Sequence, residues 1–471
     1  MRRLSLSRSA GQLQASFQYN PVFSAAGSVW ALLLGMAFLM LGNGLQGTLL
    51  GVRAASEGFG STITGFVMTG YFVGFLFGSQ VALTTIKRVG HLRVFAAATC
   101  MASLAILVQS LFVAPLVWGL MRIVTGYCLA SAYIVTESWL NDRVTNQHRG
   151  GLLAIYMIIS YSGIAGGQLL LNTGSPDSHE LFIICSVLIT FAAIPILLSI
   201  TPQPVQETTE NFSAAELYRV SPLGVVGAFA GGILQGALFS MGAVYAREIG
   251  LDIADTSYFM FLFIGGAAVL QWPVGKLSDL IDRRRVIAGL AFAGAVTPIV
   301  TYIVISADPG LILWMAVIFG VAPSLLYSMF IAYTNDYLRP EQMVAASSLL
   351  TLIYGAGAVI GPPAAGMLMD LAGPHGFLGL LSLGHAGLFA FALYRMTRRE
   401  SVPIEEQSPY YPGAVTRTAS LAPAYAEWVQ EQSGDAGSAA DDASTQAAAT
   451  EVGPERDTVD EASVTPKPAG S

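Results

Sequence analysis

Long apolar runs alternate with short polar segments along most of the chain, from about residue 28 to about residue 397. Each run reaches about 20 residues, which is the length that an α-helix needs to cross the hydrocarbon core of a bilayer. The pattern therefore predicts twelve transmembrane helices, near residues 28–52, 61–83, 93–113, 116–139, 151–172, 180–201, 222–246, 256–275, 286–306, 310–333, 343–369 and 376–396.

Polar landmarks in and beside these runs recur about 190 residues further along the chain. Gln46 returns as Gln235, Gln80 returns as Gln271, and the Asn-Asp pair at 141–142 returns at 335–336. Two homologous halves of six helices each are the simplest explanation, and an even number of crossings gives both halves the same orientation. The predicted fold class is an all-α integral membrane protein built from two parallel six-helix pseudo-repeats.

Composition supports this fold and divides the chain into parts. Hydrophobic residues make up 54% of the chain and charged residues only 11%, so a soluble core of this size would lack the polar surface to cover itself. From Glu400 onward, 13 acidic residues stand against three basic ones, and such a segment buries too little apolar surface to fold. We predict a cytoplasmic N-terminal segment 1–27, a bundle 28–201, a cytoplasmic linker 202–221, a second bundle 222–397 and a disordered acidic cytoplasmic tail 398–471.

Positive charges fall almost entirely on one side of the predicted spans. The loops of the other side hold only Arg53 and Arg247. Cytoplasmic loops carry the excess of Lys and Arg, so both termini are expected in the cytoplasm of a multi-pass protein of the inner (plasma) membrane. The predicted cytoplasmic side carries Arg2, Arg3, Arg8, Lys87, Arg88, Arg93, Arg143, Arg149, Arg219, Lys276, Arg283, Arg284, Arg285, Arg339, Arg395, Arg398 and Arg399.

Several motifs resemble those of the major facilitator superfamily. The loop 275–285 has a Gly, an Asp four residues on and then an arginine cluster, and it is similar to the signature between the eighth and ninth helices of that superfamily. The matching loop 86–93 has Lys87 where the superfamily usually places Asp. Residues 122–126 resemble its Arg-x-x-x-Gly motif, and residues 357–362 resemble its Gly-x-x-x-Gly-Pro packing motif.

More narrowly, segments 136–138, 149–157 and 271–275 resemble the YcaD-type branch of the superfamily, for which no substrate is firmly established. The resemblance implies the major facilitator fold and a transporter whose halves alternately expose a central site. It also implies helix-packing roles for Gly126, Gly357, Gly361 and Pro362.

The loop 275–285 suits a cytoplasmic latch or gate formed by Gly275, Asp279, Arg283 and Arg284. The carboxylate of Asp279 can face a helix N-terminus, and the arginines can pair with acids on a neighbouring span. The alternative is that the arginines only anchor the helix on the positive side of the membrane.

Arg122 and Glu137 are the charged residues placed well within spans, both on the fourth. Fifteen residues separate them by about 60° around the helix and about 22 Å along it, so they need different partners. Arg122 is predicted to bind an anionic solute group or to tune a proton site, with a structural hydrogen bond to carbonyls of the first helix as the alternative. Glu137 is predicted to form a gate salt bridge with Arg88 or Arg93, or to carry protons.

Polar residues at mid-depth mark the candidate substrate cavity. The repeated glutamines are the main candidates, because the first and seventh helices flank the cavity in the resembled fold; amides that hydrogen-bond between packed helices are the alternative. Aromatic rings and amides with one cation favour a moderately hydrophobic organic solute over a sugar or a multiply charged metabolite. The predicted set is Asn43, Gln46, Tyr71, Arg122, Tyr161, Gln168, Gln235, Tyr327 and Tyr354.

The predicted function is secondary active transport of a small organic solute by alternating access, coupled to protons. The sequence has no Gly-x-x-x-x-Gly-Lys-Ser/Thr loop, so ATP is not the direct driver. The proline motif of the eleventh span favours efflux and its absence from the fifth favours uptake, with efflux slightly preferred.

Two alternatives of other classes remain open: a non-transporting membrane sensor with a signalling tail, and an integral membrane enzyme. The five histidines are scattered and form no acid-base constellation, which speaks against the enzyme. We expect a monomer in the lipid bilayer that handles a small solute and protons, without a cofactor, a metal or a nucleic-acid partner.

Overall fold

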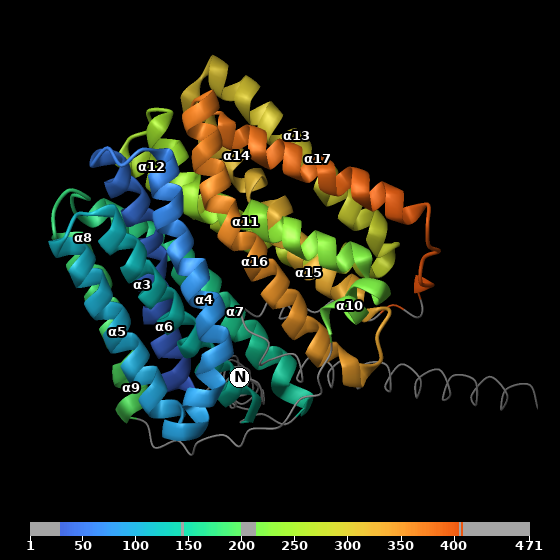
Figure 1. Ribbon diagram of the computed structural model, residues 1–471, viewed down its shortest axis with the longest axis horizontal. Coiled ribbons are helices and arrows are strands. Elements are labelled where there is room, and N and C mark those ends of the chain that lie inside the picture. The colour runs from blue at the N-terminus through green and yellow to red at the C-terminus, as the bar shows by residue number, and fades with distance from the viewer. Residues whose placement is uncertain (1–28, 143–145, 199–212, 405–406, 408–471) are drawn as a thin grey trace, which may run out of the picture. The chain divides into compact units, whose positions relative to one another are not determined.

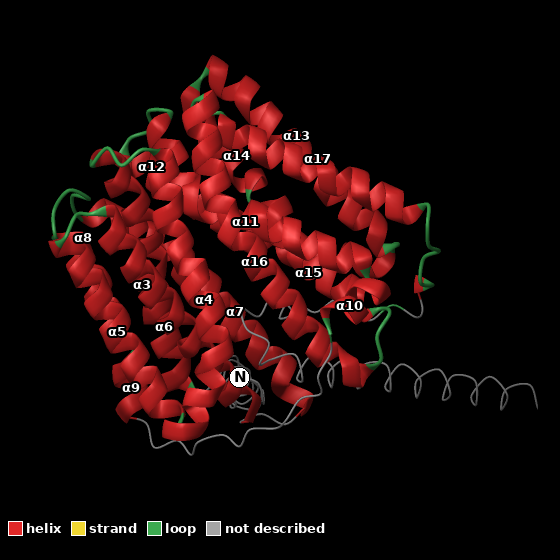
Figure 2. Cartoon of the chain, viewed as in Figure 1, coloured by secondary structure: helices red, strands yellow, loops and turns green. Residues whose placement is uncertain are grey.

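The computed structural model describes residues 29–142, 146–198, 213–404 and 407, and within this part of the chain all regular secondary structure is helical (Figures 1 and 2). The predicted all-α fold class is therefore confirmed. Several predictions lie outside the described residues: the N-terminal segment 1–27, most of the linker, nearly all of the acidic tail, and the side chains of Arg143 and Arg149.

Twelve helical segments of the described residues are long and apolar enough to cross a membrane, as the hydrophobic pattern predicts. The N-terminal half comprises α3 (Trp30–Ser56), α4 (Ser61–Val89), α5 (His91–Leu111), α6 (Pro115–Asp142), α7 (Asn146–Leu169), η1 (Leu170–Thr173), α8 (Glu180–Phe191) and α9 (Ala193–Leu198). The short α10 (Ala214–Val220) precedes the C-terminal half, which comprises α11 (Pro222–Glu248), α12 (Ile253–Leu280), α13 (Arg283–Ala307), η2 (Pro309–Leu311), α14 (Ile312–Phe319), α15 (Val321–Asn335), α16 (Pro340–Ala372) and α17 (Gly376–Met396).

Two segments that the sequence placed in loops are largely helical. Helix α4 continues to Val89, and α12 continues to Leu280, so only two residues separate α12 from α13. The apolar run marks the stretch that lies in hydrocarbon, whereas the helix continues until its backbone hydrogen bonding is interrupted. After α4 this happens at Gly90, whose φ of 89° is readily adopted only by glycine.

The helices contact one another in the same way in both halves. In the N-terminal half α3 packs on α7, α4 on α6 and α5 on α8; in the C-terminal half α11 packs on α16, α12 on α14 and α13 on α17. Contacts between the halves follow the same correspondence, since α4 packs on α16 and α7 packs on α12. The repeat in the sequence is therefore also a repeat of the packing.

Large apolar side chains cover the outside of the bundle as well as its inside. Leu116 is 76% exposed, Leu371 is 83% exposed and Leu383 is 75% exposed. A surface of this kind would associate in water, whereas in a bilayer it meets hydrocarbon. Helices that are apolar on every side are expected of membrane spans.

Several helix crossings are so close that only glycine fits at the contact. A Cβ atom on Gly126 of α6 would collide with a carbonyl oxygen of α4, and Cβ atoms on Gly357 and Gly361 of α16 would collide with carbonyl oxygens of α11. The carbonyl oxygen of Pro362 lies at a similar contact with Gly65 of α4, across the two halves. Small residues let membrane helices approach and pack in this way.

Replacement of Gly126 by alanine is expected to push α6 away from α4 and to destabilise the protein by about 1–3 kcal/mol, the usual effect of overpacking a close contact. The thermal unfolding midpoint of the detergent-solubilised protein measures this. Gly119→Ala is the matched control, because it lies on the same helix and a Cβ atom there meets nothing within 4 Å. Equal effects of the two substitutions would contradict the explanation.

Candidate functional site: a cavity between the two halves

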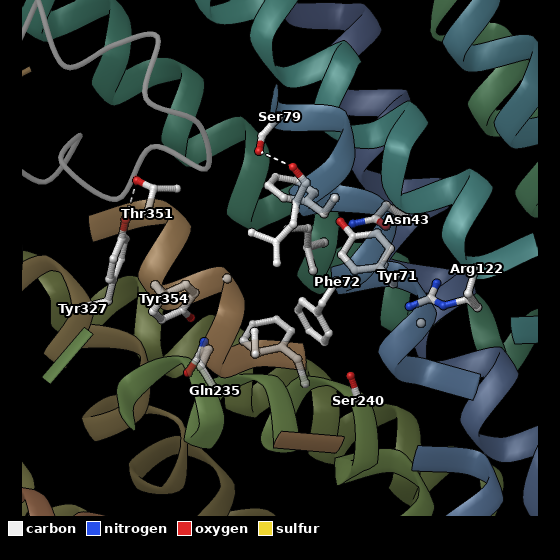
Figure 3. A pocket seen from close by; sticks show the side chains of 18 of the residues that line it. Asn43, Tyr71, Phe72, Ser79, Arg122, Gln235, Ser240, Tyr327, Thr351 and Tyr354 are labelled. Atoms are coloured by element: carbon white, nitrogen blue, oxygen red, sulfur yellow. Dashed lines mark hydrogen bonds between the residues drawn. The ribbon is translucent and has the colours of Figure 1, made fainter. Parts of the chain in front are cut away.

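A cavity lies between the two halves near the middle of the helices (Figure 3). Its volume is about 210 Å³, against ~10–15 Å³ for one water molecule, so it has room for an organic solute rather than an ion alone. Helices α3, α4, α6 and α7 line it from the N-terminal half, and α11, α12, α15 and α16 line it from the C-terminal half. A solute that fills the cavity contacts both halves.

The structure places most of the predicted cavity residues in this lining. Asn43, Tyr71 and Arg122 lie on one side of the space, and residues of the C-terminal half lie on the other (Figure 3). The predicted residues that line the cavity are Asn43, Tyr71, Arg122, Tyr161, Gln168, Gln235, Tyr327 and Tyr354.

Gln46 does not line the cavity, so this part of the prediction is wrong. Its side chain is 1% exposed, and its Nε2 donates a hydrogen bond of 3.1 Å to Oε1 of Gln109 on α5. Asn43 and Gly47, one helical turn apart, carry the face of α3 that meets the cavity. Gln46 is rotated away from that face, and its amide is a packing contact between helices.

Some polar side chains of the lining are already satisfied by the protein. Gln168 donates from Nε2 to the carbonyl oxygen of Gly44 at 3.0 Å, which ties α7 to α3. The Tyr327 hydroxyl shares a hydrogen bond of 2.8 Å with Thr351 Oγ1, and its ring packs on Tyr354 with the centroids 4.2 Å apart. These residues give the cavity its shape.

Arg122 and Gln235 have hydrogen-bonding atoms that the protein leaves unused. Arg122 is 5% exposed, and its Nε and Nη1 are buried without a hydrogen-bond partner in the described part of the chain. Its guanidinium carbon lies 4.7 Å from the centroid of the Tyr71 ring. Gln235 donates from Nε2 to Ser324 Oγ at 3.2 Å, but its Oε1 is buried without a partner among the described residues. The alternative predicted for Arg122, a structural hydrogen bond to carbonyls of the first helix, is not seen in the described part of the chain.

The apolar part of the lining was missed by the sequence analysis. It includes Phe72 and Phe75 of α4, Phe239 of α11 and Met260 of α12. Phe77 of the same α4 points elsewhere and is 60% exposed. A phenylalanine that faces the cavity and one that faces lipid contribute equally to an apolar run, so the sequence pattern does not separate them.

Glu137 lies on α6 and is fully buried, at 0% exposed. The Tyr156 hydroxyl of α7 donates to its Oε1 at 3.3 Å. Arg88 and Arg93 are both exposed, and neither pairs with Glu137 in the described part of the chain. The predicted gate salt bridge is therefore not present in this conformation, because the arginines project outward, where charged groups are hydrated, and the carboxylate turns into the bundle.

The two halves are hydrogen-bonded to each other at one end of the bundle, which we call the sealed end. There the Ser61 hydroxyl of α4 donates to the Glu248 carboxylate of α11, and Asn172 Nδ2 donates to Ser257 Oγ at 3.0 Å. The opposite end, which carries Arg283, is called the basic end. Helices α4 and α16 run close together near the sealed end and diverge towards the basic end (Figure 1).

Asp370 connects the halves at the sealed end by capping a helix of the other half. The N-cap residue of α4 is Gly60, which offers no side-chain acceptor. The Asp370 carboxylate accepts hydrogen bonds from the backbone N–H groups of Ser61 at 3.2 Å and Thr62 at 3.0 Å. These are two of the first N–H groups of a helix, which have no partner within it, and a negative charge there is also favoured by the helix dipole.

Asp370→Ala is expected to weaken the sealed end. Loss of a helix cap costs about 1 kcal/mol, which changes the ratio of closed to open conformations by roughly fivefold. The measurement is the distance distribution between spin labels placed at Ile63 and Leu371, which are 48% and 83% exposed.

Asp252→Ala is the matched control for this substitution. Asp252 lies at the same end, but its carboxylate accepts from the N–H of Asp255 at 2.7 Å and so caps its own helix, α12. It should lower stability without changing the distance distribution. An unchanged distribution in the Asp370 variant would contradict the role of Asp370 in closure.

Arg283 joins three helices of the C-terminal half at the basic end. It is 1% exposed, and its Nη1 pairs with Asp336 Oδ1 at 2.6 Å and donates to the carbonyl oxygen of Ala332 at 3.1 Å. Its Nη2 lies 3.3 Å from Asp279 Oδ1. The sequence predicted that these arginines pair with an acid of a neighbouring span, and for Arg283 this acid is Asp336, which directly follows α15. The contacts of Arg283 fix α12, α13 and α15 to one another. Gly275 lies on α12, one turn before Asp279.

Arg284 has a separate partner, Asp282, at 2.7 Å. Burial raises the pKa of the Asp282 carboxyl, but hydrogen bonds from the side chain and backbone of Arg284 outweigh burial and hold that pKa below its ordinary value. Asp282 therefore stays ionised at neutral pH. Its carboxylate also accepts from the Arg284 backbone N–H and so caps α13.

Arg283→Met should destabilise the protein by about 3–5 kcal/mol, because it leaves the Asp336 carboxylate buried without its cation. The Asp336 side chain is only 3% exposed. Chemical or thermal unfolding measures the loss, and a second substitution, Asp336→Asn, should restore much of it. Arg285→Met is the control, since Arg285 is exposed. Failure of the double variant to recover would contradict the charge explanation.

The sequence matches the Major Facilitator Superfamily over residues 32–265 and 223–430. The chain belongs to this superfamily of transporters, which is not a family of enzymes, and it is a multi-pass membrane protein. It is similar to the MFS-type transporter YcaD of Escherichia fergusonii, with 28% identity over 378 residues, covering 80% of this chain and 97% of that protein. It is also 28% identical to YcaD of Salmonella newport over 344 residues, covering 73% of this chain and 89% of that protein.

Solved transporter structures share the fold. The nucleoside transporter NupG superimposes with a TM-score of 0.61 at 12% identity, covering 79% of this chain and 99% of that one. A bacterial homologue of the human lysosomal transporter Spinster, in an inward-facing and unoccupied conformation, superimposes with a TM-score of 0.58 at 14% identity, covering 84% and 98%. The major facilitator fold and the YcaD-type resemblance predicted from the motifs are thus confirmed.

Proposed function

We propose that this protein is a proton-coupled secondary transporter that moves a small, moderately hydrophobic organic solute by alternating access, in the direction of efflux. The observation that carries the proposal is the central cavity, which both halves build while hydrogen bonds join them at the sealed end. Rocking of one half against the other about a solute at this site would expose it to each side in turn. A cavity of this kind favours transport over a sensor role.

The proposed orientation places the basic end in the cytoplasm, because positive charges gather on the cytoplasmic side of membrane proteins. The conformation described here is then inward-facing, with the sealed end towards the outside. The proline motif 357–362 supports efflux, and it lies where α16 meets both α11 and α4.

Glu137 is the proposed proton carrier. A carboxylate buried in a membrane span is costly when charged, so its protonation changes with the conformation that buries or exposes it. The Tyr156 hydroxyl donates to this carboxylate. The exposed positions of Arg88 and Arg93 favour the carrier role over the gate salt bridge.

Transport is tested with the purified protein in liposomes that contain a pH-sensitive dye. The solutes are four small aromatic molecules of similar size: an alcohol, an amide, a carboxylate and an amine. We expect at least one of them to move protons on addition, with flux that an uncoupler abolishes. Flux without any pH change and indifferent to uncouplers would refute proton coupling, and no flux of any member would refute transport of this class of solute.

Glu137→Gln is expected to abolish proton-coupled flux while solute counterflow survives, because the amide keeps the shape of the side chain and its hydrogen bond to Tyr156 but does not carry a proton. Tyr156→Phe is the matched control: it removes the hydrogen bond and keeps the carboxylate, so coupling should persist with a shifted pH profile. Equal loss of counterflow and coupled flux in Glu137→Gln would contradict the carrier role.

A further inference from the structure

The described residues of the cavity lining leave its charge unbalanced. Arg122 is the only charged residue among the described residues that line it. It is 5% exposed, and two of its donor nitrogens, Nε and Nη1, have no hydrogen-bond partner in the described chain. Buried charges in proteins are normally paired, because an unpaired charge at low dielectric is costly.

The aromatic ring that faces this cation does not neutralise it. The Tyr71 ring, 4.7 Å from the guanidinium, offers a cation–π contact that is much weaker than an ion pair in the same setting. Glu137, on the same helix, is about 22 Å away along the axis. The guanidinium therefore keeps two N–H donor nitrogens for a group that the described part of the chain does not supply.

The opposite wall of the cavity holds a complementary unused atom. Gln235 Oε1, on α11, is a buried acceptor without a partner in the described part of the chain. Gln235 and Arg122 lie on different sides of the cavity, one from each half (Figure 3). The lining also contains the aromatic rings of Phe72, Phe75 and Phe239. Each of these features selects a different part of a ligand.

We propose that the cavity binds an amphipathic monoanion. Its anionic group, a carboxylate or a similar oxyanion, pairs with Arg122; its apolar, aromatic body lies against the phenylalanines; and a hydroxyl or N–H group donates to Gln235 Oε1. This proposal rests on the proposed transport function and names its substrate class. One negative charge neutralises the site, a second would remain buried and uncompensated, and a cation is repelled by Arg122.

A ligand bound in this way connects the two halves. Its anionic end is held by α6 of the N-terminal half and its donor end by α11 of the C-terminal half, so both contacts form fully only when the halves stand at one separation. Such a ligand has a different affinity for the different conformations, and this difference is what shifts a conformational equilibrium.

The test compares ligands that share one body and differ in charge. The probes are 4-hydroxyphenylacetate, its neutral amide 4-hydroxyphenylacetamide and the cation tyramine, with calorimetry or thermal shift of the purified protein as the readout. We expect the carboxylate to bind about 10- to 100-fold more tightly than the amide, as for a charge-assisted pair, and tyramine to bind most weakly. Phenylacetate, which lacks the hydroxyl, should bind more weakly than 4-hydroxyphenylacetate.

Arg122→Gln should remove the preference for the carboxylate over the amide, and Arg122→Lys should keep part of it, because lysine retains the charge without the planar guanidinium group. Gln235→Leu should remove the preference for the hydroxylated acid over phenylacetate. Arg247→Gln is the matched control: this arginine lies at a helix end outside the cavity lining and donates to the carbonyl oxygen of Leu251.

Equal binding of carboxylate and amide, or a carboxylate preference that survives Arg122→Gln, would overturn the proposal. So would no detectable binding of the carboxylate to the intact protein. Selective binding of the carboxylate without flux in liposomes would keep the anion site and refute transport. Flux of the amide or amine that is unaffected by Arg122→Gln would keep transport and refute the anion site.

Discussion

A charge in a membrane protein needs compensation, and three charged residues of the described chain, two of them buried and one exposed near the end of α16, differ in what supplies it. Arg283 at the basic end is paired with Asp336 within one half. Asp370 at the sealed end is compensated by backbone N–H groups of the other half. Arg122 in the cavity has no ionic partner in the described chain. The first arrangement fixes a half, the second joins the halves, and the third leaves a charge for a ligand.

The repeated and the unrepeated features of the two halves have different roles. The packing of α3 on α7 recurs as α11 on α16, and glycines bring the helix backbones together in both pairs. The buried charges of α6 do not recur. Arg122 and Glu137 belong to the N-terminal half, and the equivalent positions of the C-terminal half fall near the uncharged residues Met315 and Phe330. Phe330 is fully buried by packing alone. The shared part is a scaffold, and the specific chemistry is asymmetric.

The sequence predicted the fold well because hydrophobic length and internal repetition are properties of the chain alone. The cavity was harder to predict. Gln46 and Gln235 occupy equivalent positions, yet only Gln235 reaches the cavity, because the rotation of each helix depends on its neighbours. Asp370 and Glu248 were missed, since nothing in the local sequence shows that they meet α4 across the seam. Contacts between distant helices carry no local sequence signal.

The glycine before α4 has a consequence for the opening of the sealed end. Helix α4 has no cap of its own, so two of its backbone N–H groups lose their acceptor whenever α16 moves away. Water then has to take the place of the carboxylate, because the first N–H groups of a helix have no acceptor within it. Separation of the halves and hydration of this helix end are thus one event. Opening of the sealed end exchanges a carboxylate acceptor for water at this helix end, and closing reverses that exchange.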